Sequence, residues 1–189
     1  MTRILILIFF LVTLYSCKNE ITIPKPATYL NLKLPSHAYH RFKSECNYSF
    51  EIPTLFTLQD VYLEKTKTCH KDIHLGPLNG VIHFSYVTIN KPISEYINYC
   101  IQKVDEHKVK AIAIEDMNVL RPKSKVYGTL FELQGDVASP FHFYLTDSTK
   151  HFASGVIYFN TRPNYDSIKP VLDYIKIDLL HLMNTIEWN

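Results

Sequence analysis

Cys17 is the residue whose position most clearly indicates chemistry, because it follows an apolar run near the start of the chain. Arg3 supplies one positive charge and residues 4–14 are apolar, which is the arrangement of a secretory signal. The run has about half of the roughly 20 residues that a membrane-spanning helix needs, so we expect export rather than a permanent span. Residues 14–17 read Leu-Tyr-Ser-Cys, a pattern typical of lipoproteins, whose cysteine thiol is alkylated with diacylglycerol. The alternative is an ordinary signal peptide followed by an incidental cysteine.

A lipid on Cys17 predicts the organisation and the location of the chain. Residues 1–16 are then a cleaved signal peptide, residues 17–27 a lipid-anchored tether, and residues 28–189 a single α+β domain. Two or three acyl chains hold a protein stably on a membrane. Lys18 stands where an aspartate retains some lipoproteins at the inner membrane, so the sequence favours the outer membrane. A lipoprotein signal for export to the cell surface favours Lys followed by several acidic residues. Shortly after Lys18 there is only one acid, Glu20, which favours the periplasmic side.

Charge gives no reason to expect a nucleic-acid partner. Removing residues 1–16 takes away one basic residue, Arg3, and leaves 19 basic residues against 18 acidic ones. A near-neutral chain lacks the basic surface that attracts phosphates.

Three further cysteines are Cys46, Cys69 and Cys100. The cell envelope is oxidising, so a disulfide forms where the geometry allows it. Cys46 and Cys69 flank one apolar segment and are the expected pair, the alternative being two unpaired small core residues. Cys100 lies on the apolar stripe of an expected helix, which indicates a buried free thiol.

The histidines raise the question of a metal site. Cys69-His70-x-x-x-His74 is the densest cluster of potential ligands. No second pair at zinc-site spacing lies nearby, so we interpret the cluster as a polar loop that holds one disulfide cysteine. We predict neither a metal nor a cofactor.

A hydrolytic triad could be assembled from Ser148 or Ser139 with Asp147 and His151. Almost any polar turn supplies such a set, and no nucleophile elbow or phosphate-binding glycine loop accompanies it. We therefore expect no catalytic residue. His142 and His151 bracket the same turn, and histidines on strands more often fill a core or a surface.

Two connecting segments are candidates for contacts with a partner. Residues 121–125 form a small basic knot, which is either a solvated loop or a contact to anionic lipid or protein. Residues 160–166 join the last strand to the last helix, and Arg162 could pair with Asp166. This segment either fastens strand to helix, the interpretation we favour, or meets a ligand. The candidate interaction residues are Asp147, Lys150, Arg162, Asn164, Tyr165 and Asp166.

The elements that would position these residues follow from hydrophobic periodicity. Strands are expected at residues 29–34, 48–52, 57–65, 81–89, 111–120, 126–133, 140–145 and 152–160.

A helix begins at Asn90-Lys91-Pro92 and ends near His107. Its apolar stripe consists of Ile93, Ile97, Cys100, Ile101 and Val104. A longer helix follows Ser167, the expected N-cap, which places Pro170 where no N–H is needed, while Asp166 adds favourable charge. Its stripe consists of Ile168, Val171, Leu172, Ile175, Leu179, Leu182, Met183 and Ile186.

The order of these elements predicts the fold class. Each helix has one apolar stripe and so packs one face on a sheet, and short turns between adjacent runs indicate antiparallel neighbours. We expect an α+β sandwich with a mainly antiparallel sheet and two packed amphipathic helices. The order resembles the PsbP/Mog1-like sandwich, which says little about function.

The C-terminal part of the chain carries a family resemblance. VYGTLFELQGDVASPFHFYLTDSTKHFASGVIYFNTRPNYDSIKPVLDYIKID, residues 126–178, looks very like the gliding-motility lipoprotein GldD family of the Bacteroidetes. PKPATYLNLKLP after Cys17 and CNYSFEIP from Cys46 are similar to earlier blocks of that family. The departures lie mainly in residues 55–125.

The resemblance implies an envelope lipoprotein required for gliding, with a supporting role in the linked type IX secretion machinery. The family supplies no catalytic residue, so Cys17 is the one functional residue that it transfers. We expect a non-enzymatic scaffold whose partners are other motility or secretion lipoproteins and, through the acyl chains, the membrane. The alternatives are a lipid- or small-ligand-binding domain, which needs an enclosed apolar pocket, and a hydrolase.

Overall fold

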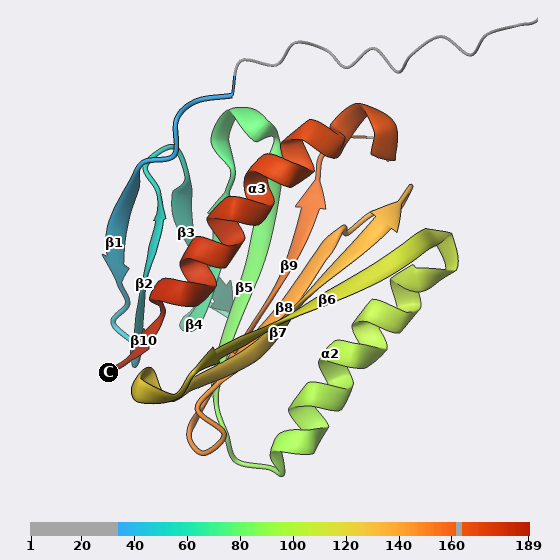
Figure 1. The fold of residues 1–189 in the computed structure, drawn as a ribbon. Coiled ribbons are helices and arrows are strands. Elements are labelled where there is room, and N and C mark those ends of the chain that lie inside the picture. Colours follow the sequence, from blue (N-terminus) through green and yellow to red (C-terminus); the bar gives the residue numbers. More distant parts are fainter. Residues whose placement is uncertain (1–33, 162–163) are drawn as a thin grey trace, which may run out of the picture.

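The computed structural model describes residues 34–161 and 164–189. Several expected features lie outside the described residues. These are the signal peptide, the tether with Cys17, all but the last residue of the expected strand at residues 29–34, and Arg162. Figure 1 shows the arrangement of the elements. In chain order these are β1 (Tyr39–Lys43), β2 (Tyr48–Pro53), β3 (Thr57–Leu63), β4 (Thr66–His74), η1 (Gly76–Leu78), β5 (Gly80–Thr88), α2 (Ile93–His107), η2 (Lys108–Lys110), β6 (Ala111–Arg121), η3 (Pro122–Ser124), β7 (Val126–Gly135), β8 (Phe141–Thr146), β9 (His151–Phe159), α3 (Tyr165–Thr185) and β10 (Glu187–Trp188).

Two antiparallel sheets make up the β structure. The larger has seven strands in the order β3-β4-β5-β9-β8-β7-β6, and the smaller has three in the order β1-β2-β10. Strands that follow each other in the chain mostly pair through short turns. The crossing from β5 to β6 is one exception, because it carries α2 and lets β9, β8 and β7 lie between them.

The core lies between α3 and the two sheets. α3 packs on β2 and crosses the face of the larger sheet (Figure 1). One continuous cluster joins residues of β2, such as Phe50, to Phe143 of β8 and to Ile175 of α3. A second, smaller cluster of Val104, Leu133 and Val137 lies under α2, which packs on β8. The expected α+β sandwich with two packed amphipathic helices is therefore confirmed.

The boundaries of the helices show what periodicity can and cannot locate. α2 ends at His107, as expected, and Cys100 and Val104 are buried on it. Ile101 is 42% exposed and so lies outside the buried stripe. The N-cap of α3 is Asn164 rather than Ser167, because the Asn164 side chain accepts a hydrogen bond from the Ser167 N–H. Pro170 is therefore inside the helix.

The interpretation of residues 69–74 as a polar loop is wrong, because they belong to strand β4. β4 pairs on both sides, with β3 and with β5, and this pairing outweighs its polar sequence. β3 ends at Leu63, before the expected Lys65. Glu64 and Lys65 both have positive φ and connect the two strands as a two-residue hairpin turn.

Candidate functional site

The expected disulfide is present. Cys46 and Cys69 are bonded, with their Cα atoms 5.9 Å apart, and the bridge ties the turn between β1 and β2 to β4 of the larger sheet. The Tyr48 hydroxyl donates to the Cys69 carbonyl at 2.8 Å beside it. Cys100 is a buried free thiol, as expected. Burial raises the pKa of Cys100 to about 11, so the thiol is unreactive.

Asp147 and His151 of the possible triad make other bonds. Asp147 Oδ1 accepts backbone N–H groups from Thr149, Lys150 and His151 at 2.9, 2.8 and 2.8 Å. Burial opposes the charge of this carboxylate, but these hydrogen bonds outweigh it and lower the pKa of Asp147 to about 2. The His151 ring instead places Nδ1 2.7 Å from the Tyr86 hydroxyl. The carboxylate therefore shapes the turn and does not orient the imidazole.

The candidate interaction residues do not form one surface. Asp147 and Lys150 precede β9, whereas Asn164 and Tyr165 follow it. β9 has nine residues, which span roughly 30 Å. The two groups are thus at opposite ends of a strand.

The start of α3 is fastened to the larger sheet. Asn164 Oδ1 accepts from the Ser167 N–H at 3.3 Å, and Asp136 Oδ1 accepts from the Tyr165 N–H at 2.8 Å. Both bonds satisfy helix N–H groups that lack intrahelical partners. Asp166 is exposed in the first turn, where its charge suits the helix dipole. Its pairing with Arg162 stays a prediction.

The histidines are distributed over separate structural contacts. His70 Nδ1 accepts the Tyr86 N–H at 3.1 Å, and His74 contacts Gln59 at 2.9 Å. Over the described ranges, no group of three or more His, Cys, Asp or Glu side chains could hold a metal ion.

His142 is buried beneath α2. Its Nε2 lies 2.8 Å from the Ser139 hydroxyl, and its ring centroid lies 5.3 Å from that of His107. Burial, together with the neighbouring His107, lowers the pKa of His142 to about 4. His142 is opposite Val156, while His151 lies at the turn end of the same hairpin, so the two histidines are apart.

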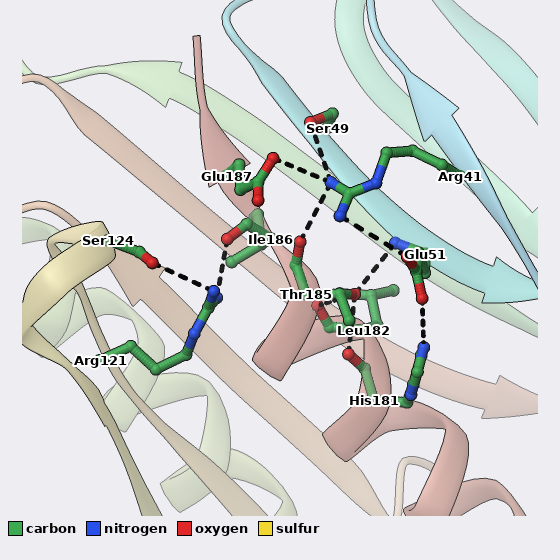
Figure 2. A network of polar contacts seen from close by, with 10 residues as sticks. All are labelled: Arg41, Ser49, Glu51, Arg121, Ser124, His181, Leu182, Thr185, Ile186 and Glu187. Carbon is green, nitrogen blue, oxygen red and sulfur yellow. Dashed lines mark hydrogen bonds and ion pairs between the residues drawn. The ribbon is translucent and has the colours of Figure 1, made fainter.

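The basic knot at residues 121–125 bonds to the residues that follow α3, and Figure 2 shows Arg121 with Ile186. Arg121 donates to the Ile186 carbonyl at 2.8 Å and to the Ser124 hydroxyl at 3.2 Å. Trp188 donates from its indole to the Lys125 carbonyl at 3.1 Å. Arg121 therefore fastens β6 to the segment after α3, and Lys123 is left exposed.

The most extensive polar network was missed by the sequence reasoning. It follows one stripe of α3, made of Tyr174, Asp178, His181 and Thr185, which we call the α3 seam. The spacing of four, three and four residues places all four on one helix face. This spacing was the available signal, since it runs beside the apolar stripe. The partners in β1 and β2 are distant in sequence and carry no such signal.

A buried carboxylate is the centre of the seam. Asp178 is 2% exposed, and its Oδ1 lies 2.7 Å from His37 Nδ1 and accepts the Tyr39 hydroxyl at 2.9 Å. We call these two contacts the clasp. Burial, with the bond to Asp178, raises the pKa of Tyr39. Within the described chain, Asp178 Oδ2 and the Tyr174 hydroxyl are buried without hydrogen-bond partners.

Aromatic stacking strengthens the clasp. The His37 ring stacks on Tyr174 with centroids 4.2 Å apart, and Tyr39 stacks on His181 at 3.6 Å. Such pairs contribute about 0.5–1.5 kcal/mol beyond the area they bury. The segment that enters the domain is therefore held on α3 by rings and by hydrogen bonds together.

The seam continues into the smaller sheet (Figure 2). Glu51 of β2 lies 2.7 Å from His181 Nε2 and 3.6 Å from the Arg41 guanidinium. Arg41 also contacts Glu187 at 3.1 Å, and the Glu51 N–H donates to the Thr185 hydroxyl at 3.0 Å. These groups bond one another, so this part of the network joins β1, β2, α3 and β10.

Three cavities are small compared with ligand sites. They measure about 40, 190 and 210 Å³, whereas ligand pockets usually measure about 300–1,000 Å³. The smallest lies between α2 and the sheet, beside Cys100 and His142.

The helices of residues 34–161 and 164–189 include none with the length and apolar character of a membrane span.

A family model described as gliding motility lipoprotein GldD matches residues 19–188. The solution structure of cyanobacterial PsbP (CyanoP) from Synechocystis sp. PCC 6803 is similar with a TM-score of 0.42 and 11% identity, over 83% of this chain and 96% of that one. No curated protein matches the sequence.

Proposed function

The chain belongs to the gliding motility lipoprotein GldD family, and from that premise we propose that it is a non-enzymatic scaffold for the gliding and type IX secretion machinery. It is a gliding-motility-related lipoprotein of the cell envelope. In the proposed arrangement Cys17 anchors it to the outer membrane and the domain faces the periplasm. Its proposed partners are other motility or secretion lipoproteins, whose assembly or stability it supports.

The clasp is the observation that supports this role. The chain from Cys17 enters the domain through the segment before β1, and there His37 and Tyr39 bind one buried carboxylate of α3. The clasp would therefore carry a pull on the anchor to Asp178 and through α3 to the two sheets. A scaffold at a moving envelope machine needs such a firm connection between its anchor and its body, whereas a soluble enzyme does not.

The polar side chains support the same proposal. Asp147 and His151, which could have formed a triad, are used to shape a turn and to contact Tyr86. Asp178, His181 and Thr185 of the α3 seam bond residues of other elements. The small-ligand alternative is less well supported, since the three cavities described above are smaller than usual ligand sites.

The test compares anchor and clasp variants in gliding cells. Cys17→Ala removes the lipid, and His37→Ala with Tyr39→Phe opens the clasp while leaving the apolar core unchanged. His40→Ala is the matched control, because His40 is an exposed histidine next to Tyr39 in β1. We expect both test variants to impair gliding and to reduce the partner lipoproteins recovered after envelope cross-linking, and the control to behave as wild type.

The proposal fails if the lipid-free Cys17→Ala protein is stable and recovers the same partners with normal gliding. In that case the tether does not organise the assembly. It also fails if the clasp variant is stable and indistinguishable from His40→Ala, because the connection between anchor and body would then be unimportant.

A further inference from the structure

An exposed apolar corner lies where α2 leads into β6. Val109 is 86% exposed and Ile112 is 85% exposed, which makes them the two most exposed large hydrophobic side chains of the described chain. Lys108 and Lys110 flank Val109, so residues 108–112 read Lys-Val-Lys-Ala-Ile. We propose that this corner docks on the lipid surface to which the chain is anchored, with Val109 and Ile112 entering the interface between head groups and acyl chains.

The backbone is shaped to present these side chains. Val109 is in the short helix η2, and Ile112 is a bulged residue, since Ala111 pairs with Gly135 and Ala113 with Gln134. A bulge re-aims the side chain of the extra residue. Gly135 has φ +120°, and a Cβ there would meet the Lys110 carbonyl at 2.7 Å and the Ile112 N at 3.1 Å. A glycine is thus required to build a corner that exposes an isoleucine.

The charges of the corner suit an anionic surface. Lys108 pairs with Asp105 at 2.8 Å, but the Lys108 side chain is 56% exposed, and exposed pairs are weak. Among the described residues, no ion pair involves Lys110. Of the acidic groups nearby, Glu106 pairs with Lys103 at 2.8 Å, and Asp136 accepts the Tyr165 N–H at the positive end of the α3 dipole. Lysines beside inserted apolar side chains are typical of protein segments that lie in a membrane interface.

A lipid surface fits the corner better than a strand of another protein. β6 is an edge strand, but the bulge at Ile112 interrupts the regular edge that an added strand needs. Glu115 and Asp116 stand in the middle of that edge, and Asp116 would face its own copy in a two-fold antiparallel pair centred there, which is unfavourable.

The anchor brings the lipid within reach. The chain between Cys17 and Leu34, the first described residue, spans at most about 60 Å when fully extended. Every face of a domain of this size, with a radius of gyration of about 15 Å, can therefore meet the membrane. The lipid anchor confines the domain near the membrane and so raises the effective concentration of lipid around the corner. A contact too weak to bind from solution is then sufficient to orient the domain.

The test measures vesicle binding without the acyl chains. The chain carrying Cys17→Ala is mixed with vesicles of phosphatidylethanolamine and phosphatidylglycerol in a roughly three-to-one ratio, and co-flotation is measured. Val109→Ser with Ile112→Ser should weaken partitioning at least about tenfold, and Lys108→Ala with Lys110→Ala should weaken it several-fold at low salt. Tyr62→Ser with Leu63→Ser is the matched control, because these residues are 58% and 60% exposed at the hairpin of the opposite edge.

The proposal predicts that substitutions in the corner weaken vesicle binding and that the control substitutions do not. It is wrong if the chain does not bind vesicles, or if the corner and control variants bind equally. It is also wrong if the corner variants leave vesicle binding unchanged but alter self-association in sedimentation, because the corner would then be a protein contact. The scaffold role is unaffected by any of these results, since the assay contains no other envelope protein.

Discussion

Removal of the disulfide should destabilise the domain by about 3 kcal/mol. Cys46 and Cys69 are 23 residues apart, and closing a loop of that length removes conformational entropy from the unfolded chain worth about 3 kcal/mol at 25 °C. The bridge also joins the two sheets, so its loss should first loosen β1 and β2. Replacing both cysteines by alanine removes the bond without leaving a reactive thiol.

The assay is thermal unfolding of the Cys17→Ala chain, with and without a thiol reductant. For a domain of this size we expect the Cys46→Ala, Cys69→Ala variant to melt about 6–12 °C below the oxidised protein. The reductant should lower the Tm of the wild-type chain towards the same value and leave the variant unchanged. Cys100→Ala is the control, because its free thiol lies outside the bridge, and it should keep the full response to the reductant.

One result would refute this reasoning directly. If the oxidised protein and the double variant melt within about 2 °C of each other, then the bridge does not restrict the unfolded chain as its loop length requires. A reductant response that remains in the double variant would place the sensitive thiol chemistry elsewhere.

Three further predictions concern buried or hydrogen-bonded polar groups. Asp178→Ala leaves the His37 ring without its carboxylate and should lower the free energy of unfolding by about 2–3 kcal/mol in urea titrations; an effect below about 0.5 kcal/mol would contradict the importance of the clasp. The pKa of His142 is lowered to about 4 by burial and by His107. The free energy of unfolding is therefore unaffected by this group above about pH 6.5 and falls by about 3 kcal/mol as the pH is lowered towards 4. His142→Gln should flatten this part of the profile of stability against pH. The pKa of Asp147 is about 2, because its turn hydrogen bonds outweigh burial; allowing for solvent screening, it should contribute about 1 kcal/mol above pH 4 that disappears as the pH falls through 2, and Asp147→Ala should show no such loss in acid titrations.

Much of the fold could be predicted, because the spacing of apolar residues along a helix or strand indicates which of its faces is buried. Helix α2 ended at His107 as expected, and the apolar runs of β7, β8 and β9 matched the structure closely. β4 was missed because its residues 66–74 are mostly polar and its stability comes from two neighbouring strands. β10 has two residues, too few for any period to appear.

The site was less predictable than the fold because its bonds are long-range. The pairing of Cys46 with Cys69 could be inferred from their position around one apolar segment and from the compartment. The clasp could not, since His37 and Asp178 are 141 residues apart. An aspartate on a helix indicates an exposed position in general, and only the fold shows that Asp178 is buried against rings from another element.

The position of β10 has a consequence for how the protein is made. Arg41 near the start of the described chain pairs with Glu187 at its end, 146 residues later, and β10 completes the sheet that β1 and β2 begin. The smaller sheet therefore cannot close until residues 187 and 188 are available. In an exported chain, which crosses the membrane from its N-terminus, β1 and β2 emerge well before β10, so this sheet is expected to close late.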